Sequence, residues 1–270
     1  MADRRLPTVI ATLAVVLVAA VLRDLLAPLA HRLGRRAAAV ADSVRPAPAP
    51  PATLPIQVKG LQPATGPQTR PADQLGYFEQ LARADSRRRI RASAGYTYLN
   101  EVVAESADSS LHRWEDRAAR PVRVYLPAGT VANFQPTFLD AVRNALERWA
   151  EAGVPVRFAV GADSTSAEVV FRWKVQFDID RTGQADLTWD QDGHILSSIV
   201  TIATFDPHGR PLAVGDIQVV AIHEIGHVLG LDHSSDSSDI MFASTRVRDL
   251  SPRDIRTALL LYQLAPGSLR

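Results

Sequence analysis

Residues 223–233 read HEIGHVLGLDH, and the spacing of polar residues in this stretch predicts both local structure and chemistry. Residues four apart lie on one face of a helix, so His223 and His227 can direct two imidazoles at one metal ion. Gly230 can adopt the left-handed conformation that ends a helix and reverses the chain. The reversal can bring His233 up as a third nitrogen ligand, which leaves one coordination position of a zinc ion for water.

A carboxylate lies between the first two predicted ligands. Glu224 is close enough to take a proton from that water without binding the metal itself. We therefore predict one catalytic zinc, held by His223, His227 and His233, with Glu224 as general base. The histidines outside the motif are expected to be ordinary core or surface residues: His31, His112, His194 and His208.

Composition narrows the possible functions of the chain. Its 270 residues are 46% hydrophobic and 22% charged, which is typical of a globular protein and excludes wholesale disorder. The formal net charge of +1 provides no general attraction for nucleic acid, and no nucleic-acid partner is predicted. Since the chain has no cysteine, disulfides, thiol nucleophiles and cysteine-ligated metals are excluded.

The N-terminal part of the chain has the pattern of a targeting segment. Residues 8–22 (TVIATLAVVLVAAVL) carry no charge and follow Arg4 and Arg5. We expect residues 1–44 to be an export signal or a membrane anchor, so the remainder would be secreted or tethered outside the cytoplasm. Cleavage and retention of this segment both remain open.

Three further regions follow along the chain. Residues 45–71 are rich in proline and predict a linker. Residues 72–109 carry a modest helical pattern around Leu75, Phe78, Leu81 and Ala82, followed by Arg87–Arg89, which is expected to be a solvated helix face. Residues 110–267 are predicted to be the catalytic domain.

Periodicity within residues 110–267 predicts alternating strands and helices. Asp216 is a natural N-cap for a helix beginning at Ile217, and residues 190–193 (DQDG) predict a hairpin turn. The expected strands are residues 121–126, 156–160, 167–177, 182–188 and 194–204, and the expected helix before the motif is 136–152.

The sequence around the motif resembles the matrixins, a family of metzincin zinc endopeptidases. Residues 229–234 (LGLDHS) have the matrixin form of the motif's end, and residues 239–242 (DIMF) resemble the Met-turn. Residues 250–255 (LSPRDI), continuing to Leu261-Tyr262, resemble the matrixin C-terminal helix, for which Ser251 is the expected N-cap. The resemblance covers about residues 110–267.

The resemblance implies a fold and an activity. The fold is α+β: a mixed twisted sheet of about five strands packed on two long helices, with a C-terminal helix after the Met-turn. The activity is hydrolysis of peptide bonds in a peptide or protein substrate, which would lie extended along residues 183–188, in a protein expected to be a monomer. Met241 would form a hydrophobic floor beneath the zinc.

Several features differ from the family pattern or leave alternatives open. Without cysteine, the propeptide cysteine that silences many matrixins is excluded, and no histidine between Phe177 and Asp192 is available for a second zinc. Ala243 stands where a proline commonly follows the Met-turn. Calcium is not predicted, because solvated turn carboxylates are the simpler interpretation of Asp178, Asp180, Asp190 and Asp192. The alternative functions are a catalytically silent zinc-containing peptide-binding module and an envelope scaffold.

Overall fold

The computed structural model describes Arg70, residues 74–106 and residues 109–269, all within one compact unit that spans residues 54–270. The predicted signal or anchor, and all of the predicted linker except Arg70, lie outside the described residues. Among the residues that are described, no helix is both long enough and apolar enough to cross a membrane.

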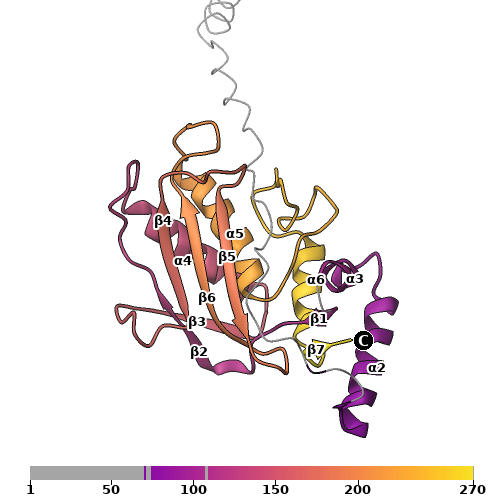
Figure 1. Cartoon of the computed structure of the whole chain (residues 1–270). Coiled ribbons are helices and arrows are strands. Elements are labelled where there is room, and N and C mark those ends of the chain that lie inside the picture. The colour runs from indigo at the N-terminus through magenta and orange to yellow at the C-terminus, as the bar shows by residue number, and fades with distance from the viewer. Residues whose placement is uncertain (1–69, 71–73, 107–108, 270) are drawn as a thin grey trace, which may run out of the picture. The chain divides into compact units, whose positions relative to one another are not determined.

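A five-stranded mixed sheet forms one layer of the domain (Figure 1). Its strand order is β3-β2-β4-β6-β5, with β5 antiparallel to β6 and the other neighbours parallel. Alternation buries Val122 and Val124 on one face of β2, as expected for a half-buried strand. The strands are β2 (Arg117–Tyr125), β3 (Val156–Gly161), β4 (Val169–Lys174), β5 (Gly183–Trp189) and β6 (Ile195–Ala203).

Two long helices pack against each other and against one face of this sheet (Figure 1). Helix α4 (Thr137–Glu151) is amphipathic, and it buries Phe138, Val142 and Trp149 at helical spacing. Helix α5 (Val214–Val228) is buried continuously from Val219 to Val228, so it lies in the interior of the domain. The α+β architecture predicted from the sequence is therefore confirmed, and a strand or helix is found at each predicted place, although the bounds of some elements differ.

The predicted start of α5 is wrong by three residues. The helix begins at Val214 with Ala213 as N-cap, so Asp216 occupies the third helical position. From there its carboxylate accepts a hydrogen bond of 3.2 Å from the backbone N–H of Ala213. An acidic side chain at the third helical position also caps the N-terminus of the helix, by accepting the N–H of the N-cap residue. In the sequence it therefore looks the same as an N-cap aspartate.

The C-terminal helix begins as predicted. Helix α6 (Pro252–Leu261) follows Ser251, whose hydroxyl accepts hydrogen bonds from the backbone N–H groups of Arg253 and Asp254. Proline at the first helical position needs no N–H partner and has the backbone angle that a helix requires.

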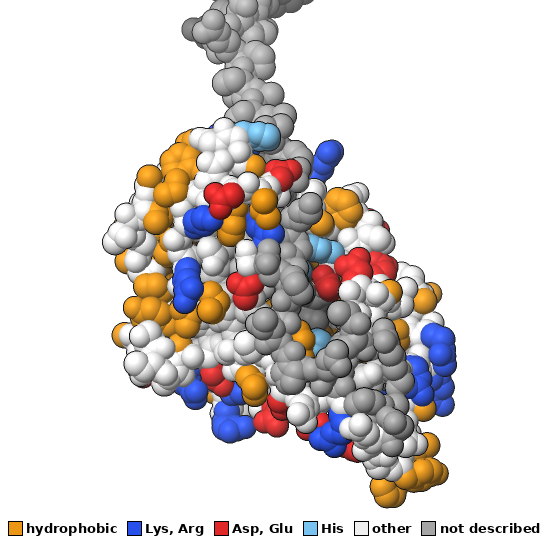
Figure 2. Space-filling model, viewed as in Figure 1, with side chains coloured by type: hydrophobic (Ala, Val, Ile, Leu, Met, Phe, Trp, Pro, Cys, Tyr) orange, Lys and Arg blue, Asp and Glu red, His pale blue; other side chains and the backbone are white. Residues whose placement is uncertain are grey.

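The described part of the segment before the sheet contains two helices and a short strand. Helix α2 (Tyr77–Ala92) is followed by α3 (Leu99–Glu105), and β1 (Ser110–Leu111) pairs with β7 (Gly267–Ser268) near the C-terminus. The buried face of α2 contains Arg83, Ser86 and Ile90. Apolar side chains lie exposed at its first turns, where Figure 2 shows a hydrophobic tip at the lower right: Tyr77, Phe78 and Leu81.

Candidate metal centre

Helix α5 places two imidazoles side by side in the core. The Nδ1 atom of His223 lies 2.7 Å from the carbonyl oxygen of Ile240, and the Nδ1 atom of His227 lies 2.8 Å from that of Leu231. A carbonyl only accepts, so each Nδ1 carries the proton and each Nε2 carries a lone pair. The two Nε2 atoms are 3.1 Å apart, which without a proton between them is repulsive and fits a shared cation.

A glycine turn brings the third histidine to the same place. Gly230 has φ +96, and its N–H donates to the carbonyl of His227 at 2.8 Å. A Cβ atom at this position would lie 1.9 Å from the carbonyl oxygen of His112, so only glycine fits. After this turn, the ring of His233 lies 5.3 Å from that of His223, between centroids, and 5.0 Å from that of His227.

The three histidines form a group that could hold a metal ion. Among the described residues, the Nε2 atom of His233 is buried without a hydrogen-bond partner. Burial lowers the pKa of all three: well below the usual value for His223, in which the other two histidines add to the effect, and to about 3 for His233. The rings are therefore neutral near pH 7, the form that binds zinc. The predicted ligands are thus brought together, in a chemical state that fits zinc.

Glu224 directly follows His223 on α5, and the residue is 1% exposed. Within the described part of the chain, neither of its carboxylate oxygens has a hydrogen-bond partner. Burial raises its pKa well above the usual value, Arg181 opposes this shift, and Asp186 adds to it. Such a carboxylate can take up and release a proton, and its free oxygens can accept hydrogen bonds from water.

Two residues near the start of the edge strand β5 lie close to Glu224. A Cβ atom on Gly183 would lie 2.2 Å from the Oε1 atom of Glu224, so the strand backbone directly adjoins the carboxylate. Arg181 is 5% exposed, and its guanidinium donates to Gln184 at 2.8 Å. Gly183 is the first residue of the strand predicted to bind substrate, but its contact with Glu224 was not predicted. Arg181 was not identified, because it belongs to no motif and is distant from Glu224 along the chain.

A methionine packs against helix α5. Met241 is fully buried, and a Cβ atom on Gly226 would lie 2.3 Å from its sulfur. Gly226 therefore allows the thioether to contact the α5 backbone between the two histidines. Trp149 fixes the same stretch by donating from its indole N–H to the carbonyl of Ile222 at 2.9 Å.

Two carboxylates lie on the outer side of His233. Glu105, Asp232 and His233 form a second group that could hold a metal, and the Nδ1 atom of His233 is 3.9 Å from an oxygen of Asp232. Burial raises the pKa of Glu105, and the charges of Asp232 and Glu101 add to this effect. Sequence reasoning missed both carboxylates. Asp232 is inside the quoted motif, whereas Glu105 carries no local signal.

The remaining candidate residues lie outside the three-histidine group. His112 stacks on Trp189 with ring centroids 4.0 Å apart, and His194 lies 3.3 Å from Asp190. His208 is exposed, and His31 is outside the described residues. Three of the four turn carboxylates considered for calcium have protein partners: Asp178 pairs with Lys174, Asp192 pairs with Arg70, and Asp190 accepts backbone hydrogen bonds.

Comparisons with known proteins find similarity to one family. The family model described as Matrixin matches residues 130–263. Metalloendoproteinase 1-MMP of Arabidopsis thaliana is 32% identical over 133 residues, which are 44% of this chain and 36% of that protein. Matrilysin of Felis catus is 46% identical over 59 residues, 20% of this chain and 22% of that protein.

The chain therefore spans about a third or less of the length of these curated relatives. Among solved structures, the GM1-bound form of the ECX AB5 holotoxin matches with a TM-score of 0.38 and 16% identity, over 60% of this chain and 86% of that chain. This structural similarity is too low to inform the function. The family model, the relatives and the mixed α+β fold together show that residues 130–263 are similar to the matrixin domain of metalloendoproteinases.

Proposed function

We propose that the protein is a zinc-dependent endopeptidase that hydrolyses peptide bonds of protein substrates outside the cytoplasm. In this proposal His223, His227 and His233 hold the zinc, and Glu224 is the general base. The observation that carries it is the convergence of three neutral imidazoles beside a buried carboxylate whose oxygens have no described partner. Matrixin-like relatives support zinc as the metal.

When bound, zinc would polarise the substrate carbonyl and make a water molecule more acidic. Glu224 would accept the proton of the attacking water at a carboxylate oxygen. The same carboxyl group would then donate this proton to the nitrogen of the departing amine. Its raised pKa supports both steps, because a buried carboxyl group holds a proton more readily than an exposed one.

The edge of the sheet supports binding of an extended substrate. Strand β5 is the outermost strand next to β6, and its first residue, Gly183, adjoins Glu224. A peptide strand added to this edge would form backbone hydrogen bonds with β5 and bring one of its peptide bonds near the carboxylate. Such binding uses the backbone, so it accepts many substrate sequences.

We also propose that the domain works after export, because the apolar residues 8–22 follow two arginines at the start of the chain. The same segment would either be removed or tether the enzyme to the membrane. A fusion of residues 1–53 to a reporter that is active only outside the cytoplasm tests the export. A reporter that stays inactive in export-competent cells would refute it.

The catalytic proposal is tested with the purified full chain. We expect about one zinc per chain by elemental analysis, and cleavage of a fluorescence-quenched unfolded protein that a chelator abolishes. Glu224→Ala should keep its zinc and lose cleavage, whereas the exposed control Glu151→Ala should keep both. A folded wild type that binds no zinc would refute the proposed metal centre. Zinc-loaded wild type without cleavage would favour the silent peptide-binding module.

A further inference from the structure

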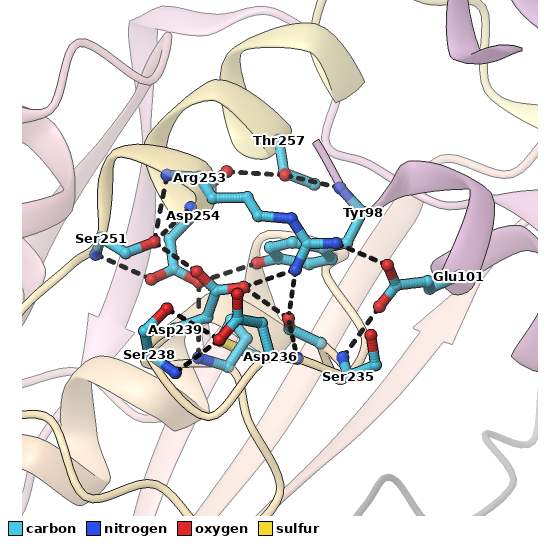
Figure 3. Close-up of polar contacts among 12 residues, drawn as sticks. Tyr98, Glu101, Ser235, Asp236, Ser238, Asp239, Ser251, Arg253, Asp254 and Thr257 are labelled. Atoms are coloured by element: carbon cyan, nitrogen blue, oxygen red, sulfur yellow. Dashed lines mark hydrogen bonds and ion pairs between the residues drawn. The ribbon is translucent and has the colours of Figure 1, made fainter. Parts of the chain in front are cut away.

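A polar cluster connects α3, in the segment before the sheet, to α6 and to the loop that follows the motif (Figure 3). Helix α3 provides one side of the cluster, α6 provides another, and the loop after His233 provides the third. We name it the Arg253 cluster, and it consists of Tyr98, Glu101, Ser234, Ser235, Asp239, Arg253 and Asp254.

Arg253 is the centre of this cluster. Its Nη1 atom donates to the hydroxyl of Ser234 at 2.7 Å and to Asp239 at 2.6 Å. Its Nη2 atom donates to Glu101 at 2.5 Å, and the guanidinium lies 5.1 Å from the ring centroid of Tyr98. The Arg253 and Glu101 side chains are 17% and 22% exposed, so these charge-assisted bonds are only weakly screened by water.

One set of bonds runs from α3 to the third histidine. The second oxygen of Glu101 accepts a hydrogen bond of 2.8 Å from the backbone N–H of Ser235. Ser234, the residue directly after His233, donates its own N–H to the carbonyl of Met241 at 3.0 Å. The backbone that leaves His233 is therefore held by α3 on one side and by the Met-turn on the other.

A second set of bonds runs from α3 to the first histidine. The Tyr98 hydroxyl donates to one oxygen of Asp254 at 3.1 Å, and the backbone N–H of Ile240 donates to the other at 2.9 Å. The carbonyl of Ile240 in turn accepts the Nδ1 proton of His223 at 2.7 Å. Hydrogen bonds thus connect Tyr98, the N-cap of α3, to the His223 imidazole, and they connect Glu101 to the backbone that follows His233.

The segment that carries α3 is also bonded along the C-terminal part of the chain. Arg87 donates to the carbonyl of Leu269 at 2.9 Å, and Arg89 donates to the side chain of Gln263 at 2.5 Å. The backbone N–H of Tyr98 donates to the hydroxyl of Thr257 at 3.1 Å. These contacts attach α2 and α3 to α6 and to the residues that follow it.

We propose that Glu101 and Tyr98 are positioning residues of the metal centre, so that residues 74–106 remain part of the working enzyme. This inference rests on the proposed function, because it assigns the cluster to the three-histidine site. Groups that orient metal ligands from outside the coordination sphere typically change metal affinity or activity by about 10- to 100-fold. If residues 74–106 were instead removed before the enzyme works, their contacts would not be needed for metal affinity.

The test measures zinc affinity directly, by competition with a chromophoric chelator in the full chain. Glu101→Ala leaves the Ser235 N–H without its acceptor and takes one carboxylate from Arg253. We expect zinc affinity to fall on the order of ten-fold, with a lower kcat and a KM that changes less than about two-fold. Asn100→Ala, on the exposed side of the same helix, is the matched control and should resemble the wild type.

Two milder variants keep the test decisive if Glu101→Ala does not fold. Glu101→Gln keeps an acceptor for Ser235 and should recover part of the lost affinity. Tyr98→Phe keeps the ring and removes only the hydroxyl that bonds Asp254, so a loss of a few-fold is expected. Folded variants whose zinc affinity and kcat match the wild type within about two-fold would overturn the proposal.

Measuring zinc affinity tests the positioning role of Glu101 and Tyr98 separately from the proposed peptidase activity. Since zinc affinity is measured without substrate, a wild type that binds zinc but cleaves nothing would refute the endopeptidase and still decide the role of Glu101. Active wild type with unchanged affinity in every α3 variant would leave the endopeptidase standing and refute the positioning role.

Discussion

The metal centre and the Arg253 cluster are neighbouring polar groups in one domain, and they differ in how their atoms are satisfied. Within the described chain, Glu224 and the Nε2 atom of His233 are buried without hydrogen-bond partners. In the Arg253 cluster, by contrast, Arg253 and Asp254 are each bonded to several groups. A buried polar atom without a partner costs stability, whereas a satisfied network fixes a geometry.

This difference separates two roles that polar residues have in an enzyme. Atoms left unsatisfied by the protein are available to a metal, a water molecule or a substrate. Fully bonded atoms hold those free groups in place. Variants of the metal centre should therefore change activity more than stability, whereas variants of the Arg253 cluster should lower stability as well as zinc affinity.

The largest effect is expected from Glu224→Gln. Loss of a general base typically lowers kcat by about 10²- to 10⁴-fold, and the amide cannot take the proton. The unfolding free energy of the metal-free protein should not fall, because the ionised carboxylate is buried without a described partner. Steady-state kinetics and urea unfolding check both parts. A variant that unfolds more easily but retains kcat would contradict the comparison.

Asp254→Ala should show the opposite pattern. It removes the acceptor of the Tyr98 hydroxyl and of the backbone N–H groups of Ile240 and Ser251. Leaving such buried donors unsatisfied should lower the free energy of unfolding by about 3 kcal/mol or more.

Urea unfolding measures this loss, and Asp140→Ala is the control. Asp140 is mostly exposed and bonds only to Arg143 among the contacts described, so its removal should cost less than about 1 kcal/mol. Equal losses for the two variants would show that the Arg253 cluster is no more important to stability than an ordinary surface pair.

The sequence predicts the two regions unequally. The ligands of the metal centre lie within eleven residues, on one helix and one turn, so local periodicity is enough to predict them. The bonds of Glu101 and Tyr98 join residues more than a hundred positions apart, and no local pattern indicates which element lies opposite α3. For the same reason Arg181 was missed beside Glu224.

The error at Asp216 has a different physical origin. An acidic residue favours the first turn of a helix whether it precedes the helix or lies inside it, because both positions reach free backbone N–H groups. Composition alone therefore indicates that a helix begins near Asp216. It does not distinguish the N-cap from the third helical residue.

Gly230→Ala tests the turn that connects the two regions, with a smaller expected effect. The φ angle of +96 strains any other residue, and the new Cβ would meet the carbonyl of His112. We expect a loss of about 2–3 kcal/mol in unfolding free energy, together with weaker zinc binding.

Gly209→Ala is a matched control for that substitution. Its φ of +77 imposes the same kind of backbone strain, but no atom lies within 4 Å of the new Cβ. Its cost should stay near about 1 kcal/mol, with zinc binding unchanged. If both variants lose the same stability, the contact with His112 contributes nothing and only the backbone angle matters.

The smallest expected effect is on the pH dependence of stability. Comparing two aspartates separates the effect of burial on a carboxyl pKa from the effect of hydrogen bonding. Asp163 and Asp254 both accept backbone and hydroxyl hydrogen bonds. Hydrogen bonds from Ser166 and Thr165 lower the pKa of the exposed Asp163 to about 2. Burial raises the pKa of Asp254 above its usual value, although its hydrogen bonds act in the opposite direction.

These shifts have opposite consequences for stability. The favourable contribution of Asp163 is present above its unfolded pKa and is lost as pH falls through its folded pKa of about 2. For Asp254 the ionised form is penalised, so a cost appears as pH rises through its raised folded pKa. NMR titration of the two carboxyl carbons should place the pKa of Asp163 below the usual aspartate range and that of Asp254 above it.

Ser166→Ala should raise the pKa of Asp163 and leave that of Asp254 unchanged. A pKa for Asp254 below that of Asp163 would mean that hydrogen bonding outweighs burial in the Arg253 cluster, and the cost assigned to its buried charge would have to be abandoned.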